Sequence, residues 1–188
     1  MKPLYMALVH HPVLDSSGEV VATNITNFDI HDIARAARVY GIERYFIVHP
    51  MREQLMFVSR VLDHWRVGPG QKYNVMRKTA LTMVEPIETL EASVQFIKDL
   101  GHKDLQVLAT SAKETSQNPQ LTFRQTRESL DKKPTLLVFG TGFGLTQGAL
   151  DLCDFCIEPI RGFGEEDYRH LSVRSAVSIC LDRLRGAW

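Results

Sequence analysis

Apolar residues fall into two patterns that alternate along the chain. Short apolar runs bounded by glycine, proline or polar residues predict buried strands at 5–10, 44–50, 80–86, 104–110, 134–140 and 154–159. Apolar positions at helical spacing predict helices over 28–41, 53–65, 87–101, 121–131, 144–152 and 170–184. Loops are predicted over 67–74 and 111–120. Strands that alternate with helices predict an α/β fold, with a mostly parallel sheet flanked by helices.

Length and composition agree with a single domain spanning residues 1–188. The chain is 44% hydrophobic and 23% charged, which are globular proportions. The N-terminal sequence MKPLYMALVHHPV lacks the apolar run of a signal peptide, and no stretch approaches the roughly 20 apolar residues that span a bilayer. We therefore expect a cytoplasmic protein without a membrane segment.

The three cysteines predict neither a disulfide nor a metal site. Cys153 and Cys156 form a C-x-x-C pair inside the apolar segment ALDLCDFCIEPI, and Cys180 stands apart. A zinc site of the common kind needs further ligands at short spacing, and a second C-x-x-C is missing. Free cysteine commonly behaves as a small apolar residue, so we expect reduced thiols in the core.

Charge is balanced overall, but basic side chains gather in one segment. The formal net charge is zero, whereas residues 52–78 contain six basic side chains against Glu53 and Asp63. The six are Arg52, Arg60, Arg66, Lys72, Arg77 and Lys78. Such a segment is compatible with a phosphate-binding face, and equally with an ordinary solvated helix face and loop.

Three loops near the C-terminus have residues that suit a ligand site. The segments 140–144 and 158–164 each follow a predicted strand and are rich in glycine, and 170–175 opens the last predicted helix. Glycines at the carboxyl end of a strand let the backbone approach a ligand closely. The spacing G-x-G-x-G fits neither a dinucleotide fingerprint nor a P-loop. Each loop alone could be a turn or a helix cap, but three in series favour a ligand site.

Taken together, the three loops resemble one known family. The sequences VFGTGFGL, IEPIRGFG and HLSVRSAVSICLDRL are similar to the C-terminal knot of SPOUT RNA methyltransferases. The resemblance implies a trefoil knot over about 134–188, a rare exception to unknotted topology, and S-adenosylmethionine held by the three loops. The residues that it assigns to the cofactor are Phe139, Gly140, Thr141, Gly142, Gly144, Glu158, Ile160, Gly162, His170, Leu171, Ser172, Arg174 and Ser175.

A second match lies near the N-terminus. The run Asn27–Gly41, followed by the strand RYFIVHP, resembles the first motif of the tRNA 2′-O-methyltransferases of this family. Arg35 falls on the arginine of that motif, and the resemblance implies that it binds RNA phosphate or activates a hydroxyl. An ion pair with Asp32 is an equally ordinary role for it. Asp29 replaces an asparagine of the motif and His31 a glycine, which leaves the target atom open.

A general base is expected near the knot. Methyl transfer requires orientation and, for a nitrogen or hydroxyl acceptor, removal of a proton. Glu165, Glu166, Asp167 and His170 are candidates for this base, although the acidic run Glu165–Asp167 also fits a solvated loop before a helix. Arg35 is a further candidate catalytic residue, in its role toward phosphate or hydroxyl.

The resemblance implies S-adenosylmethionine-dependent methylation of a tRNA or rRNA nucleotide by a homodimer. The last predicted helix is apolar on more than one side, so that one side would pack on the sheet and the other on a partner. Arg35 of one subunit would then reach the partner's methyl donor. A non-catalytic RNA-binding knotted dimer stays open as an alternative. So does a nucleotide-binding oxidoreductase that uses 140–144.

Overall fold

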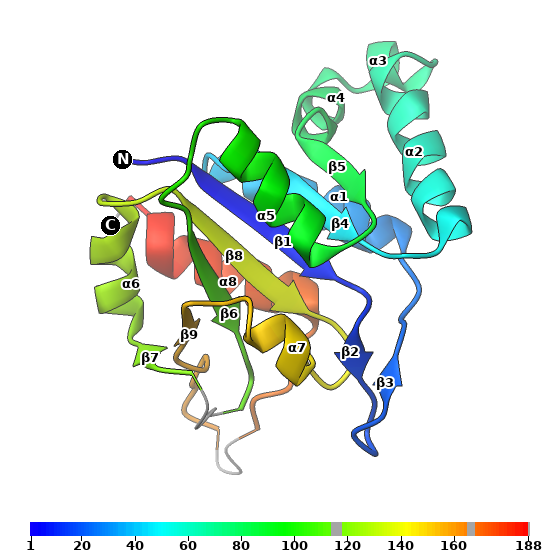
Figure 1. Cartoon of the computed structure of the whole chain (residues 1–188). Coiled ribbons are helices and arrows are strands. Elements are labelled where there is room, and N and C mark those ends of the chain that lie inside the picture. Colours follow the sequence, from blue (N-terminus) through cyan, green and yellow to red (C-terminus); the bar gives the residue numbers. More distant parts are fainter. Residues whose placement is uncertain (114–117, 165–167, 188) are drawn as a thin grey trace.

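The computed structural model describes residues 1–113, 118–164 and 168–187, and in these ranges the sheet has seven strands, all parallel (Figure 1). Its order is β5-β4-β1-β8-β6-β9-β7. The strands are β1 Leu4–Val9, β4 Tyr45–Val48, β5 Val84–Ile87, β6 Gln106–Thr110, β7 Gln120–Leu121, β8 Thr135–Gly140 and β9 Phe155–Ile157. A short antiparallel pair, β2 Val13–Leu14 and β3 Val20–Val21, stands apart from the sheet. The predicted mostly parallel sheet with flanking helices is confirmed.

Helices cover both faces of this sheet (Figure 1). They are α1 Asn27–Val39, α2 Arg52–Arg66, α3 Gly70–Tyr73, α4 Val75–Leu81, α5 Leu90–Asp99, α6 Phe123–Leu130, α7 Gln147–Leu150 and α8 Val173–Arg185. In β1 and β4 neighbouring side chains point to opposite faces and both sets are buried, as expected of a sheet covered on two sides. One core lies under α1, α6 and α8, and the other under α5 and α7.

Residues 67–83 differ from the prediction. The predicted loop contains the short helix α3, and the residues expected to start a strand at 80 instead end the helix α4. The Asn74 side chain accepts a hydrogen bond from the Arg77 backbone N–H and so caps α4. The apolar residues Ala80 and Leu81 are buried as predicted, but by a helix, because short apolar runs do not separate strand from helix.

Helices α2 and α8 each bury one face. In α2, Val58 and Leu62 are buried, whereas Met56 and Ser59 face solvent. The last helix begins at Val173, with Ser172 as its N-cap, and its fully buried residues form one face: Val177, Cys180, Leu181 and Leu184. In the part of the chain that the structure describes, none of the helices is long and apolar enough to cross a membrane.

Candidate functional site

A cavity of about 330 Å³ opens at the carboxyl ends of β8, β6 and β9, beside the N-terminus of α8. This is the edge at which parallel α/β sheets bind ligands. Ten of the thirteen residues that the sequence assigns to a cofactor line it: Phe139, Gly140, Thr141, Gly142, Gly144, Glu158, Ile160, His170, Leu171 and Ser172. Loops separated by up to about 30 residues in the sequence therefore enclose one volume.

The remaining predicted residues lie elsewhere. Gly162, Arg174 and Ser175 are not among the residues that line the cavity in the described ranges. The Ser175 N–H donates to the Ser172 hydroxyl at 3.3 Å, which makes Ser175 part of a helix cap. Asp167 lies outside the residues that the structure describes.

Sequence reasoning missed the loop that follows β6. Thr110, Ser111, Ala112 and Lys113 line the cavity, although the sequence predicted only a polar connection there. The reason is the strand order: β6 lies between β8 and β9, so its carboxyl end opens into the middle of the site. Val173, Ala176 and Cys180 of α8 add an apolar wall.

The glycine loop after β8 depends on backbone geometry. Gly142 has a φ of +57° and Gly144 a φ of +119°, both in the region that favours glycine. A Cβ on Gly142 would come within 2.7 Å of the Leu14 carbonyl oxygen. The loop is held against β2 by two hydrogen bonds, from the Phe143 N–H to the Leu14 carbonyl (2.8 Å) and from the Leu14 N–H to the Gly144 carbonyl (2.9 Å).

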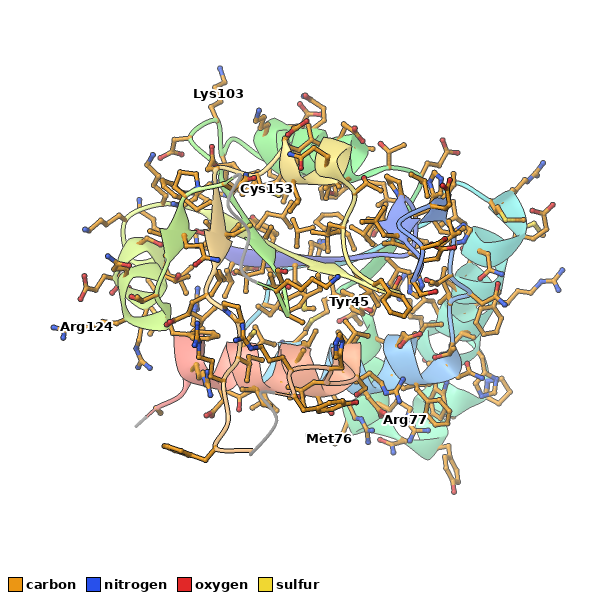
Figure 2. All side chains as sticks on the ribbon, turned by 90° about the horizontal axis from the view of Figure 1, so that it is seen from below. Tyr45, Met76, Arg77, Lys103, Arg124 and Cys153 are labelled. Atoms are coloured by element: carbon orange, nitrogen blue, oxygen red, sulfur yellow. The ribbon has the colours of Figure 1, made fainter. Side chains whose placement is uncertain are left out.

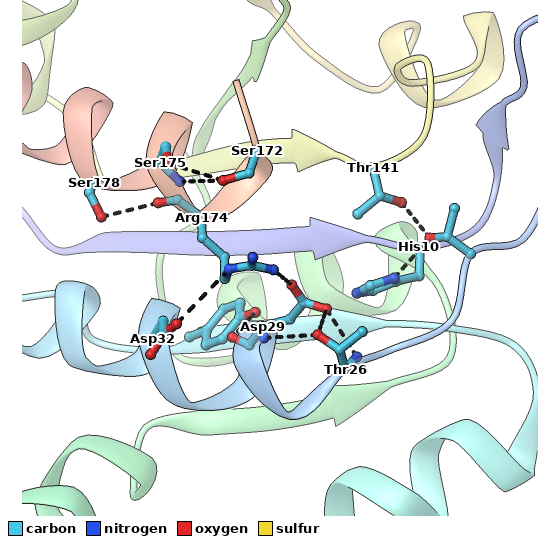
Figure 3. A network of polar contacts seen from close by, with 11 residues as sticks. His10, Thr26, Asp29, Asp32, Thr141, Ser172, Arg174, Ser175 and Ser178 are labelled. Atoms are coloured by element: carbon cyan, nitrogen blue, oxygen red, sulfur yellow. Dashed lines mark hydrogen bonds and ion pairs between the residues drawn. The ribbon is translucent and has the colours of Figure 1, made fainter. Parts of the chain in front are cut away.

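A chain of hydrogen bonds links this loop to a buried histidine (Figure 3). The Thr141 hydroxyl donates to the Val9 carbonyl at 3.0 Å, so it must accept from Thr23, 2.6 Å away. The Thr23 hydroxyl then accepts from Nδ1 of His10 at 2.9 Å. His10 therefore carries its proton on Nδ1, leaving Nε2 buried and without a hydrogen-bond partner among the described residues. Burial lowers the pKa of His10 to about 4, against the opposing effect of Asp29.

Asp29, which departs from the family motif, contacts Arg174, which the resemblance assigned to the cofactor. The Arg174 guanidinium lies 3.5 Å from the buried Asp29 carboxylate and 5.3 Å from the ring of Phe28, and so joins α8 to α1 (Figure 3). The Asp29 carboxylate also accepts hydrogen bonds from the N–H and hydroxyl of Thr26, completing the N-terminal cap of α1. Removing Arg174 would leave the buried Asp29 carboxylate without its cation, so the two side chains stabilise one another.

Arg35 does not lie on the buried side of α1. Its side chain is 56% exposed and forms an ion pair with Asp32, which is the ordinary role that the sequence allowed. Arg66 of the basic segment also makes contacts within the protein. Its guanidinium donates hydrogen bonds to the backbone carbonyls of Leu81 and Val84. That arginine holds α4 and β5 in place and is not available to phosphate.

The cysteines are buried and free, as predicted. Burial raises the pKa of Cys153 and of Cys180 to about 12. Cys153 lies on the face of the sheet covered by α5 and α7, far from the labelled Met76 and Arg77 (Figure 2). Both thiols therefore remain protonated at neutral pH.

Comparison with known proteins supports the resemblance. Residues 3–186 match the model of a family described as SAM-dependent RNA methyltransferase. The chain is 39% identical to a tRNA (guanine-N(1)-)-methyltransferase of Oleidesulfovibrio alaskensis over 97% of its own length and 42% of that protein. It is 36% identical to an uncharacterized protein of Aquifex aeolicus, covering 96% of this chain and 87% of that one. The chain thus spans less than half the length of the tRNA methyltransferase that it matches.

Solved structures share the fold. The TrmH/SpoU tRNA modifying enzyme of A. aeolicus superposes with a TM-score of 0.56 at 17% identity, covering 98% of this chain and 75% of that chain. The SpoU methyltransferase AviRb of Streptomyces viridochromogenes, solved with AdoMet, gives 0.58 at 13% identity, covering 98% of this chain and 57% of that chain. The family match over nearly the whole chain shows that this protein belongs to the SAM-dependent RNA methyltransferases.

Proposed function

We propose that the chain transfers a methyl group from S-adenosylmethionine to a nucleotide of RNA, with the cofactor in the cavity beside β8, β6, β9 and α8. The observation that carries this proposal is the cavity itself, since the loops that the family uses for its cofactor line one volume of about 330 Å³. An oxidoreductase has no comparable support, because the family match is to a transferase.

The residues around the cavity suit a folded, partly apolar ligand with polar ends. Ile157, Ile160 and Leu171 offer apolar surface, and Lys113, in the loop after β6, is a cation suited to a carboxylate. The Glu158 carboxylate accepts the Phe123 N–H at 2.7 Å, and that bond fixes the loop after β9 against α6.

S-adenosylmethionine supplies an electrophilic methyl group, so the protein has to orient the acceptor and remove a proton. His170 lines the cavity and is exposed at its edge, where it would take the proton from the acceptor N–H or O–H. Arg35, exposed on α1, would hold the RNA backbone of the partner's substrate. Asp167 remains a further candidate base on sequence grounds.

A trefoil knot over 134–188 and a homodimer are part of the same proposal. Family membership supports both. The first helix adds Val39, which is 76% exposed and would lose that exposure against a second copy. A dimer would bury more than roughly 1,000 Å² and would bring Arg35 near the partner's cavity.

The substrate proposed first is tRNA, because the O. alaskensis relative is named for a tRNA guanine. The test is incubation with S-adenosylmethionine and separate tRNA and rRNA pools from a strain that lacks the protein, followed by nucleoside mass spectrometry. We expect one new methylated nucleoside, in tRNA, and its loss in a His170→Ala variant that still binds S-adenosylhomocysteine. Cofactor binding without transfer to either pool would instead identify a non-catalytic RNA-binding protein.

A further inference from the structure

A second concave surface lies on the other side of α1 from the cofactor cavity. It is an open groove of about 510 Å³ between α1 and α2. Asn27 and His31 of α1 line it, together with five residues of α2: Phe57, Arg60, Val61, His64 and Trp65.

Aromatic rings form much of this groove and are held in place. The ring centroid of Trp65 lies 5.7 Å from that of His31 and 5.1 Å from that of His64, both at nearly perpendicular angles. A Cβ on Gly70 would lie 2.7 Å from the Trp65 ring, so α3 packs closely against the indole at this glycine. The groove is therefore preformed, so ordering its side chains around a planar ligand would cost little free energy.

Cations surround these rings. Arg60 lines the groove, and the Arg77 guanidinium lies over the Trp65 ring at 4.6 Å. Among the described residues, those that line the groove include no carboxylate. Flat apolar surface bordered by guanidinium groups is complementary to a nucleobase with its phosphate, and aromatic platforms with cationic edges are the common way to bind unpaired nucleotides.

The groove is connected to the cofactor cavity by residues that, like those of the groove, are cationic or aromatic. Val173 lines the cavity, and the next residue, Arg174, lies over the ring of Phe28, which is 63% exposed. Phe28 directly follows Asn27, the first residue of the groove. An arginine and an aromatic ring thus lie between the two concave surfaces, at the start of α1.

We propose that the groove binds an unpaired nucleotide of the RNA substrate, next to the nucleotide that enters the cofactor site. The base would contact the His31, His64 and Trp65 rings, while Arg60 would face the phosphate. Arg77, packed over the Trp65 ring, would support the indole. This inference rests on the proposed function, because it takes RNA to be the substrate. It adds a site that recognises the RNA substrate by contact with a base other than the one that is methylated.

Tryptophan fluorescence tests this binding directly. Trp65 and Trp188 are the two tryptophans of the chain, so a Trp188→Phe protein leaves Trp65 as the reporter. Titration with the single-stranded RNA hexamer A6 should quench Trp65 to saturation. Arg60→Ala and His64→Ala, each made in this background, should weaken binding of A6 by about tenfold, since one base–aromatic contact is worth about that much.

The matched control is Arg124→Ala. Arg124 is a 90% exposed helix cation on α6, at the opposite side of the molecule from Arg77 (Figure 2). We expect this variant to bind A6 as the parent does, and all variants to bind S-adenosylhomocysteine equally. Unchanged affinity for A6 in both groove variants would overturn the proposal, even if methyl transfer is observed. A Trp65 signal that depends on protein concentration, and not on A6, would also overturn it and assign the groove to a second copy. Groove binding without methylation of any RNA would instead sink the proposed function alone.

Discussion

Replacing Gly142 with alanine should displace the loop after β8. The new Cβ would lie 2.7 Å from the Leu14 carbonyl oxygen, a backbone atom that cannot rotate away. The φ of +57° adds about 1–2 kcal/mol for a residue with a Cβ. Opening the loop weakens the hydrogen bonds that join Phe143 and Gly144 to Leu14, at about 1 kcal/mol. We expect the free energy of unfolding to fall by about 2–3 kcal/mol.

The same displacement should reduce cofactor affinity. Binding would have to push the loop back, and each 1.4 kcal/mol of that cost is about a tenfold loss of affinity. Calorimetric titration with S-adenosylhomocysteine and urea unfolding measure the two effects. Gly148→Ala is the matched control, because Gly148 lies in α7 with nothing within 4 Å of its added Cβ. It should leave cofactor affinity unchanged and should raise the free energy of unfolding slightly, by at most about 1 kcal/mol. A Gly142→Ala protein with wild-type stability and affinity would refute this reasoning.

Three further predictions follow from individual side chains. Lys113→Ala should weaken S-adenosylhomocysteine binding about tenfold in the same calorimetry, and Lys113→Arg should largely retain it, if the cation meets the cofactor carboxylate. The thiols of Cys153 and Cys180, with pKa values of about 12, should react with a thiol reagent at pH 8 only after unfolding; rapid reaction of the folded protein would contradict their burial. The pKa of His10 is lowered to about 4, so the neutral form stabilises the fold above pH 6.5, and this contribution, about 3 kcal/mol, should be lost as the pH falls from 6.5 to 4. Urea unfolding across that range should show a flatter pH dependence for His10→Gln, and equal slopes would show that His10 titrates normally.

Local patterns predicted most of the elements, because strand and helix periodicities depend on neighbours in the sequence. Gly41 and Gly101, predicted to end helices, do so with φ values of +68° and +99°. The prediction of a strand over 80–83 was wrong, because the apolar run there fits the end of a helix as well as a strand. The loops that line the cavity at 139–144, 158–160 and 170–172 were predicted because glycines and a resemblance marked them.

Contacts between distant segments could not be predicted in this way. The loop at Thr110–Lys113 joins the cavity only because β6 lies between β8 and β9, and strand order is not visible in a local pattern. The ion pair between Asp29 and Arg174 joins residues 145 positions apart. From the sequence Asp29 was only a departure from a family motif, and Arg174 was only a residue assigned to the cofactor.

The structure of the protein in complex with S-adenosylhomocysteine is the most direct test of where the cofactor lies. We predict that the ligand occupies the cavity between Phe139–Gly144, the loop at Thr110–Lys113 and the start of α8. Its homocysteine carboxylate or adenine should contact backbone groups of at least two of these segments. A ligand bound elsewhere on the chain, with this cavity empty, would contradict the assignment of the active site.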